Sequence, residues 1–198
     1  MAEAALMSGL EFLSVSASWF KAAGERPENG MHPKIATIGY EGSTLQALLG
    51  ALEAADVQTL VDVRAVPLSR KPGFSKQALR AGVESVGLDY LHLRDLGNPK
   101  EGREAAKVGG MPAFASIYEA HLVSTPAQTA LGELAALAQE RRVCLLCFEA
   151  DPLTCHRLLV ARALVAKAGG TIEHLHPQAS RFGSGHGHHR KQLSSALR

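Results

Sequence analysis

The sequence predicts a single α/β domain with a mostly parallel sheet of about five strands flanked by helices. Two observations lead to this prediction. Short apolar segments alternate with capped amphipathic segments between residues 34 and 176, which is typical of repeated strand–helix units. In addition, 198 residues with 46% hydrophobic content suit one domain with a sizeable core.

The first strand–helix–strand unit covers residues 34–63. Residues 34–40 and 57–63 are short apolar stretches that predict strands. Between them Leu45, Leu48, Leu49 and Leu52 follow the i, i+3, i+4, i+7 spacing of a buried helix face, and a turn at residues 42–44 offers a helix cap. Such a unit indicates two parallel strands joined by a right-handed crossover.

The alternation continues to residue 175. Residues 75–85 predict a helix that ends at Gly87, and residues 89–93 predict a third strand. Residues 94–112 are expected to form a long polar loop, a kind that is usually functional or mobile. A helix over 125–140, an apolar strand over 143–147, a helix starting at Asp151-Pro152 and a strand over 171–175 complete the domain.

The ends of the chain differ from this domain. Residues 1–33 are expected to be a weakly structured N-terminal extension, and residues 177–198 a disordered, basic, His-rich tail whose metal affinity is adventitious. After Pro177 there are four basic residues and no acidic one, so acidic residues outnumber basic ones before it. The folded part therefore lacks the basic character of a typical DNA-binding domain, and any anion needs a local patch.

Cysteine usage and hydropathy suggest a cytoplasmic protein. The three cysteines lie within one short segment, unlike the spread-out, even-numbered framework of a secreted disulfide protein. No apolar run approaches the roughly 20 residues of a membrane helix, and no basic residue precedes the apolar stretch near the start as in a secretory signal. We therefore expect no membrane partner; the oligomeric state stays open.

Polar residues follow the strands at one edge of the predicted sheet, where parallel sheets bind ligands. Asp62 and Arg64 alternate along a strand and so share a face, as a structural bridge or with Arg64 aimed at an anion. Two further segments leave strands at this edge. One is Tyr40-Glu41-Gly42, and the other runs from Cys147 to Arg157 and carries two cysteines, a histidine and an arginine.

The cysteines are expected to play different roles. Cys144 and Cys147 form a C-x-x-C, but residues three apart in a strand point to opposite faces, so we expect Cys144 to be an inert core residue. Cys155 is expected in the first turn of a helix, where free amides and Arg157 favour a thiolate with a lowered pKa. The alternative is a buried Cys155 with Arg157 in a structural ion pair.

Residues 67–76 form a basic loop with Arg70, Lys71, Lys76 and one aromatic residue, Phe74. Phosphate contact and base stacking would use this mixture, but so would a solvated basic loop. His92 and His121 are single histidines near apolar residues, where a structural role is the common one.

These segments together resemble the domain of unknown function 488 family. The matching pieces, in the family's order, are residues 37–42 (TIGYEG), 60–64 (LVDVR) with Pro67 and Ser69, 73–76 (GFSK), 90–97 (YLHLRDLG), and 145–149 (LLCFE) with 155–157 (CHR). The resemblance implies a Rossmann-like α/β domain and a polar pocket built from these motifs, and it implies no reaction. A looser likeness to rhodanese-type domains suggests sulfur transfer by analogy only, since the segment from Cys147 to Arg157 is too long for their cysteine cradle.

Three hypotheses follow. The favoured one is a thiol-dependent enzyme that binds a phosphate, nucleotide or nucleic acid; the others are a non-catalytic nucleic-acid-binding module and a zinc site at Cys147, Cys155 and His156 with a fourth ligand from elsewhere. The favoured hypothesis assigns no cofactor and no metal ligand. Its catalytic residues are Cys147, Cys155, His156 and Glu149, and its substrate-binding residues are Tyr40, Glu41, Asp62, Arg64, Ser69, Phe74, His92 and Arg157.

Overall fold

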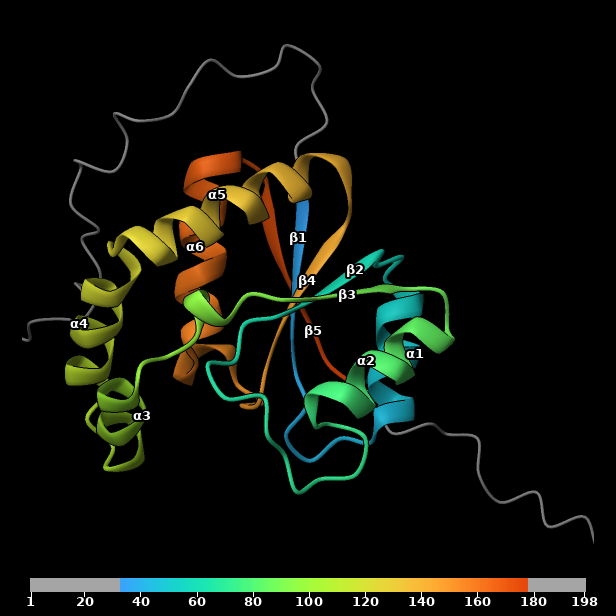
Figure 1. The fold of residues 1–198 in the computed structure, drawn as a ribbon, viewed down its shortest axis with the longest axis horizontal. Coiled ribbons are helices and arrows are strands. Elements are labelled where there is room, and N and C mark those ends of the chain that lie inside the picture. The colour runs from blue at the N-terminus through green and yellow to red at the C-terminus, as the bar shows by residue number, and fades with distance from the viewer. Residues whose placement is uncertain (1–32, 178–198) are drawn as a thin grey trace, which may run out of the picture.

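The computed structural model describes residues 33–177, which form a five-stranded, all-parallel sheet in the order β3-β2-β4-β1-β5 (Figure 1). This confirms the predicted α/β domain with a parallel sheet of about five strands. The strands are β1 (Lys34–Gly39), β2 (Thr59–Asp62), β3 (Asp89–His92), β4 (Val143–Cys147) and β5 (Thr171–Leu175).

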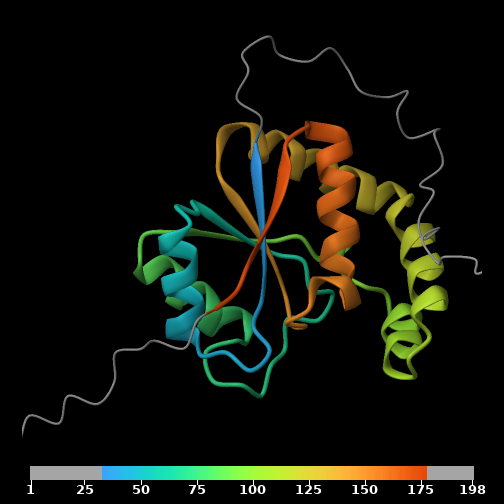
Figure 2. The same cartoon turned by 180° about the vertical axis from the view of Figure 1, so that it is seen from behind.

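Helices cover both faces of the sheet (Figures 1 and 2). The α-helices of the described part are α1 (Leu45–Ala54), α2 (Lys76–Ser85), α3 (Lys100–Lys107), α4 (Met111–Leu122), α5 (Thr125–Glu140) and α6 (His156–Ala168). Two 3₁₀ turns, η2 (Arg94–Leu96) and η3 (Pro152–Thr154), lie among them. One core cluster joins α1 and α2 to one face, and a second joins α4, α5 and α6 to the other.

The period of two along each strand decides which core a residue enters. In β4, Cys144 and Leu146 pack in the core beside α1 and α2, whereas Val143 and Leu145 pack beside α4, α5 and α6. The leucine stripe of α1 faces the core beside α1 and α2. Leu48 and Leu52 are fully buried, and Leu45 and Leu49 are half-buried against the same core, so the stripe is less completely buried than its spacing predicts.

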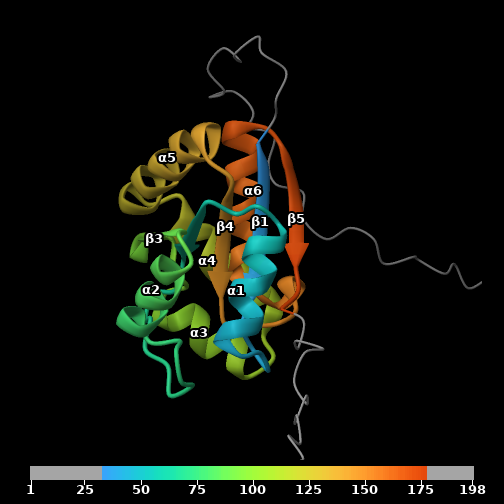
Figure 3. The ribbon, with the colours of Figure 1, turned by 90° about the vertical axis from the view of Figure 1, so that its right-hand side faces the viewer.

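The two strands joined by α1, β1 and β2, are not neighbours in the sheet. β1 and β2 are parallel as expected, but β4 lies between them and pairs with both. Continuous apolar sequence suits β4 for this central position, because a central strand is covered on both faces. Figure 3 shows β5 at one edge of the sheet and β3 towards the other.

The prediction of a long polar loop at residues 94–112 is wrong. This segment contains η2, α3 and the start of α4, and α3 packs against α4. The helix was hidden because α3 is short, strongly polar and interrupted by Gly102, so that no apolar stripe marks it. The helix expected to start at Asp151-Pro152 also differs: Asp151 caps η3, and α6 begins at His156 with Cys155 as its N-cap.

The expectations for the N-terminal extension and the His-rich tail fall mainly on residues 1–32 and 178–198, which lie outside the described residues. Within residues 33–177, no helix is both long and apolar enough to cross a membrane.

Candidate active site

A cavity of about 310 Å³ opens at the carboxyl edge of the sheet, where β1, β2 and β4 end. Its walls come from four segments that are distant in sequence: the end of β1, the β2–α2 loop, the start of α3 and the β4–α6 connection. The lining residues are Tyr40, Arg64, Ala65, Val66, Leu68, Ser69, Arg70, Asn98, Arg103, Cys147, Phe148, Glu149 and His156. We call this cavity the edge pocket.

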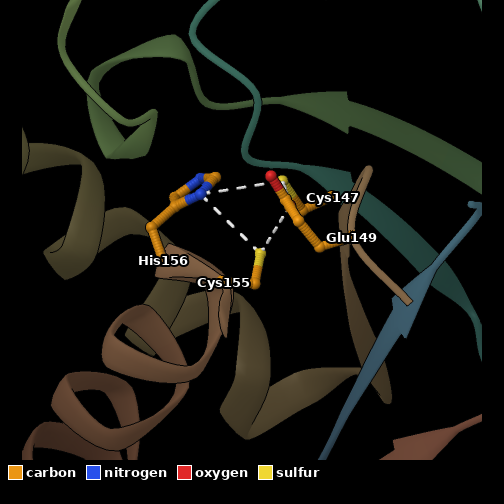
Figure 4. A group of neighbouring side chains, drawn as sticks. All are labelled: Cys147, Glu149, Cys155 and His156. Atoms are coloured by element: carbon orange, nitrogen blue, oxygen red, sulfur yellow. Dashed lines mark hydrogen bonds between the residues drawn. The ribbon is translucent and has the colours of Figure 1, made fainter. Parts of the chain in front are cut away.

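Four side chains meet at the floor of the edge pocket (Figure 4). Cys147, Glu149, Cys155 and His156 each offer one ligand atom, and these four atoms lie within 4.8 Å of one another. The thiols of Cys147 and Cys155 both donate to Oε2 of Glu149, at 3.0 and 2.9 Å. We call these four residues the floor cluster; Cys155 is its one member that does not line the edge pocket.

The orientation of His156 is set by a backbone carbonyl. Its Nε2 lies 2.8 Å from the carbonyl oxygen of Val63, and since a carbonyl only accepts, Nε2 carries the hydrogen. In a neutral imidazole, Nδ1 then keeps its lone pair. Nδ1 lies 3.6 Å from Sγ of Cys147 and 3.8 Å from Sγ of Cys155, so the lone pair faces both sulfurs.

Tyr118 of α4 holds His156 from the other side. Its ring centroid lies 5.3 Å from that of His156, and its hydroxyl donates to the carbonyl of Leu96 at 2.5 Å. Tyr118 is fully buried, and burial raises its pKa, so it stays a neutral hydrogen-bond donor. No sequence pattern marked Tyr118, because it belongs to α4 and meets His156 only through the tertiary fold.

Burial and hydrogen bonding shift the pKa values of Cys155 and Glu149 in opposite directions. Burial and the adjacent Cys147 raise the pKa of the Cys155 thiol well above its ordinary value. Burial opposes ionisation of Glu149, but hydrogen bonds from Cys147 and Cys155 outweigh it, and the pKa of Glu149 is lowered. The expected lowering of the Cys155 pKa by the helix start is therefore wrong for this arrangement, since the thiol is desolvated beside a second sulfur and a carboxylate.

Cys144 stands apart from the floor cluster. It is fully buried in the core beside α1 and α2, and burial raises its pKa. This agrees with the inert core role expected from the alternation of β4.

Asp62 and Arg64 form a buried ion pair at the pocket wall, where Arg64 lines the cavity and Asp62 does not. Nη2 of Arg64 lies 2.6 Å from Oδ2 of Asp62, and its Nε donates to Oδ1 at 2.8 Å. Nη1 donates to the hydroxyl of Tyr40 and to the carbonyl of Phe74, both at 2.9 Å. Four of the five N–H groups of Arg64 are thus used within the protein, which leaves one for a ligand.

The side chain of Arg157 lies outside the lining of the edge pocket. Its guanidinium donates to the backbone carbonyls of Glu149 and Ala150, and the side chain is buried outside the lining of the edge pocket. It fixes the β4–α6 connection that carries Glu149. Arg64 lines the pocket and Arg157 does not, so the two arginines do not converge on one ligand.

The other expected substrate-binding residues divide into two groups. Tyr40 and Ser69 line the edge pocket. Phe74 is fully buried and stacked on Tyr40, with ring centroids 4.3 Å apart, so the aromatic residue of the basic loop is not exposed for base stacking. Glu41 accepts a hydrogen bond from the backbone of Ala150, and Nε2 of His92 bonds the carbonyl of Arg64; neither lines the pocket.

Two polar residues of the edge pocket were not predicted from the sequence. Asn98 and Arg103 come from the segment that was expected to be a loop, and Nη1 of Arg103 donates to the carbonyl of Asn98 at 2.7 Å. The Asn98 side chain is buried, and its Oδ1 has no hydrogen-bond partner among the described residues. The fragment LRDLG just before Asn98 was the available signal, because it belongs to the family resemblance.

The model of the family described as "Domain of unknown function DUF488" matches residues 44–164. No match was found among curated proteins or among solved structures.

Proposed function

The chain belongs to the family of the domain of unknown function DUF488, and we propose that it is an enzyme whose catalytic centre is a zinc ion in the floor cluster. Cys147, Cys155 and His156 are the proposed ligands, and Glu149 is the proposed general base. The edge pocket above the cluster receives the substrate.

One observation carries this proposal: two sulfurs and the Nδ1 atom of an imidazole lie within 4.8 Å of one another. Tetrahedral zinc, with bonds of about 2.3 Å to sulfur and 2.0–2.1 Å to nitrogen, separates sulfur from nitrogen by about 3.6 Å. The distances from Nδ1 of His156 to the two sulfurs, 3.6 and 3.8 Å, match this sulfur–nitrogen separation. Zinc-bound histidines usually donate their other ring N–H to a fixed acceptor, and His156 donates Nε2–H to the Val63 carbonyl, which orients the ring.

The donor set suits a catalytic zinc better than a structural one. Catalytic sites use three protein ligands and keep a fourth position open, and Cys₂His is one such set. Cys147, Glu149 and His156 line the edge pocket, so a zinc ion held by the cluster would be open to a ligand from the pocket. Such an ion would lower the pKa of a bound water to about 7, and Glu149 would be close enough to take its proton.

The corresponding reaction is a hydrolysis. Water loses its proton to Glu149, its oxygen forms a bond to the electrophilic atom of the substrate, and the bond to the leaving group breaks. Glu149 then returns the proton to the leaving group. No oxidant or reductant is consumed, and the thiolates stay bound as ligands throughout.

Cobalt substitution tests the metal site. The full chain is loaded with Co²⁺, and the thiolate-to-cobalt charge-transfer absorption is recorded for the wild type, Cys147→Ser, Cys155→Ser and Cys144→Ser. We expect the band in the wild type and in Cys144→Ser, and its loss in the other two variants. The histidines of the tail do not disturb this measurement, because the tail contains no cysteine.

Zinc content measured by mass spectrometry completes the test. The wild type should hold about one more zinc per chain than His156→Gln, whereas zinc bound by the tail is common to both proteins. Equal zinc content in folded wild type and His156→Gln, together with no charge-transfer band in the wild type, would contradict the proposal.

A second candidate is a thiol-dependent enzyme with Cys147 as nucleophile. Cys147 lines the edge pocket, its thiol donates to Glu149, and the lone pair of His156 lies 3.6 Å away. Alkylation of the metal-free protein, read at each cysteine by mass spectrometry, tests this candidate. Labelling of Cys147 ahead of Cys155 and Cys144, in a protein that takes up no metal, would favour it over zinc.

A further inference from the structure

The edge pocket has a basic wall that the floor cluster does not use. Arg70 lines it from the β2–α2 loop and Arg103 from α3. Among residues 33–177 neither has a carboxylate within salt-bridge distance, whereas Arg64 is neutralised by Asp62. The wall thus carries two positive charges without a counter-charge.

The segment that brings Arg103 to the pocket is held closely against the end of β2. A Cβ on Gly97 would lie 2.2 Å from the backbone nitrogen of Ala65, so only glycine permits this approach. Arg103 is itself half-buried and anchored to the Asn98 carbonyl through Nη1, which leaves Nε and Nη2 for a ligand. α3 is therefore a fixed wall of the pocket.

The rim of the edge pocket is apolar. Val66, Leu68 and Phe148 are 48, 80 and 45% exposed, and they are three of the six large hydrophobic side chains exposed within residues 33–177. Phe148 packs edge-on against Tyr40, with ring centroids 5.4 Å apart. An exposed apolar rim beside a basic wall is typical of a site for a ligand with an anionic end and an apolar body.

We propose that the edge pocket binds a small phosphate monoester with an apolar or aromatic body, such as a nucleoside monophosphate, and that Arg70 and Arg103 bind its phosphate. This inference rests on the proposed function, since it names the substrate class of the same site. Arginine forms paired hydrogen bonds to phosphate, and two unneutralised guanidinium groups match the nearly −2 charge of a monoester. A volume of about 310 Å³ lies at the small end of ligand sites and suits a mononucleotide rather than a folded polymer.

Calorimetric titration of the full chain tests the inference. The probes are inorganic phosphate, the four ribonucleoside 5′-monophosphates, the matching nucleosides and single-stranded oligonucleotides, with zinc content measured on every sample. We expect at least one monophosphate to bind at least about tenfold more tightly than its nucleoside and than inorganic phosphate.

Three variants and a matched control locate the binding. Arg70→Ala and Arg103→Gln should each weaken monophosphate binding by about tenfold or more, because each removes a charge-assisted contact. Phe148→Ala should weaken the binding of the monophosphate but leave the binding of inorganic phosphate unchanged. Lys107→Ala is the control, since Lys107 is an exposed cation of α3 outside the pocket lining, and it should change nothing.

The possible results distinguish the zinc proposal from the phosphate monoester proposal. Monophosphate binding that survives in the Arg70→Ala, Arg103→Gln double variant, or nucleosides that bind as tightly as monophosphates, would overturn the substrate class even if zinc is present. Binding that depends on both arginines in a protein without zinc would support this inference and overturn the zinc proposal alone. Binding of single-stranded oligonucleotides about tenfold more tightly than of any monophosphate would replace the small ligand by a nucleic acid.

Discussion

The buried pair of Asp62 and Arg64 organises the wall of the edge pocket at the scale of single residues. Asp62 accepts three hydrogen bonds from Arg64, including its backbone N–H, and a fourth from the hydroxyl of Tyr90 at 2.6 Å. Asp62 is fully buried and Arg64 nearly so. A buried charge of this kind persists only while its partner stays in place.

Asp62→Asn should therefore lower the free energy of unfolding by about 3–5 kcal/mol, because the charge of Arg64 would remain buried without an anionic partner. Urea denaturation measures the loss. Arg141→Ala, which breaks the exposed pair with Asp89, is the control and should cost at most about 1 kcal/mol. A change below 1 kcal/mol in Asp62→Asn would mean that the pair contributes no more than a surface bridge.

Gly39 determines how closely the floor cluster approaches the sheet. A Cβ at this position would lie 1.8 Å from the carbonyl oxygen of Glu149, so any side chain would push the β4–α6 connection away. Gly39→Ala should cost about 1–3 kcal/mol through this overpacking and should also weaken the cobalt charge-transfer band.

Gly50→Ala is the matched control for Gly39→Ala. A Cβ on Gly50 of α1 would meet nothing within 4 Å, so this change should stabilise the protein by about 0.5–1 kcal/mol and leave the cobalt band intact. If both alanine variants behaved alike, close approach at Gly39 would not be what positions Glu149.

At the scale of elements, α1 is held to the sheet by one side of its leucine stripe. Leu48 is fully buried in the core beside α1 and α2, whereas Leu49 is only half-buried. Leu48→Ala should cost about 2–5 kcal/mol, since it leaves a cavity in addition to the lost burial. Leu49→Ala should cost clearly less, and equal losses in thermal unfolding of the two variants would contradict the assigned helix orientation.

The β4–α6 connection is the element that assembles the floor cluster. β4 ends at Cys147, η3 follows, and Cys155 caps α6, with its Sγ 3.5 Å from the backbone nitrogen of Arg157. Arg157 ties the connection to its own carbonyls at Glu149 and Ala150. All four cluster residues therefore lie between positions 147 and 156, but they converge on one point only when this connection is folded.

At the scale of the whole molecule, the floor cluster lies between the sheet and α4, since His156 contacts both Val63 and Tyr118. An ion bound there stabilises the folded state and not the unfolded chain. Zinc at about a thousand times its dissociation constant should add about 4 kcal/mol to the free energy of unfolding and raise the melting temperature. A chelator should reverse this gain in the wild type and have no effect in Cys147→Ser; an equal effect in both would assign the stabilising zinc to another site.

The sequence by itself determined the types of most elements and the edge of the sheet where the site lies. Periods of two and of 3.6 residues are local properties, so they predicted the five strands, the buried face of α1, and the opposite orientations of Cys144 and Cys147. The convergence of parallel strands at one edge then brought Arg64 and the Cys147 segment together in the prediction.

Only the tertiary structure decided the partners of the charged groups and the insertion of β4 between β1 and β2. Arg64 donates to Tyr40, Asp62 and Phe74, and Arg157 donates to two nearby carbonyls. Among residues 33–177, the pocket cations without a carboxylate partner are therefore Arg70 and Arg103. Periodicity cannot predict this, because a guanidinium reaches acceptors on any neighbouring segment. The short polar helix α3 was missed for a related reason: its position depends on packing against α4 rather than on an apolar stripe of its own.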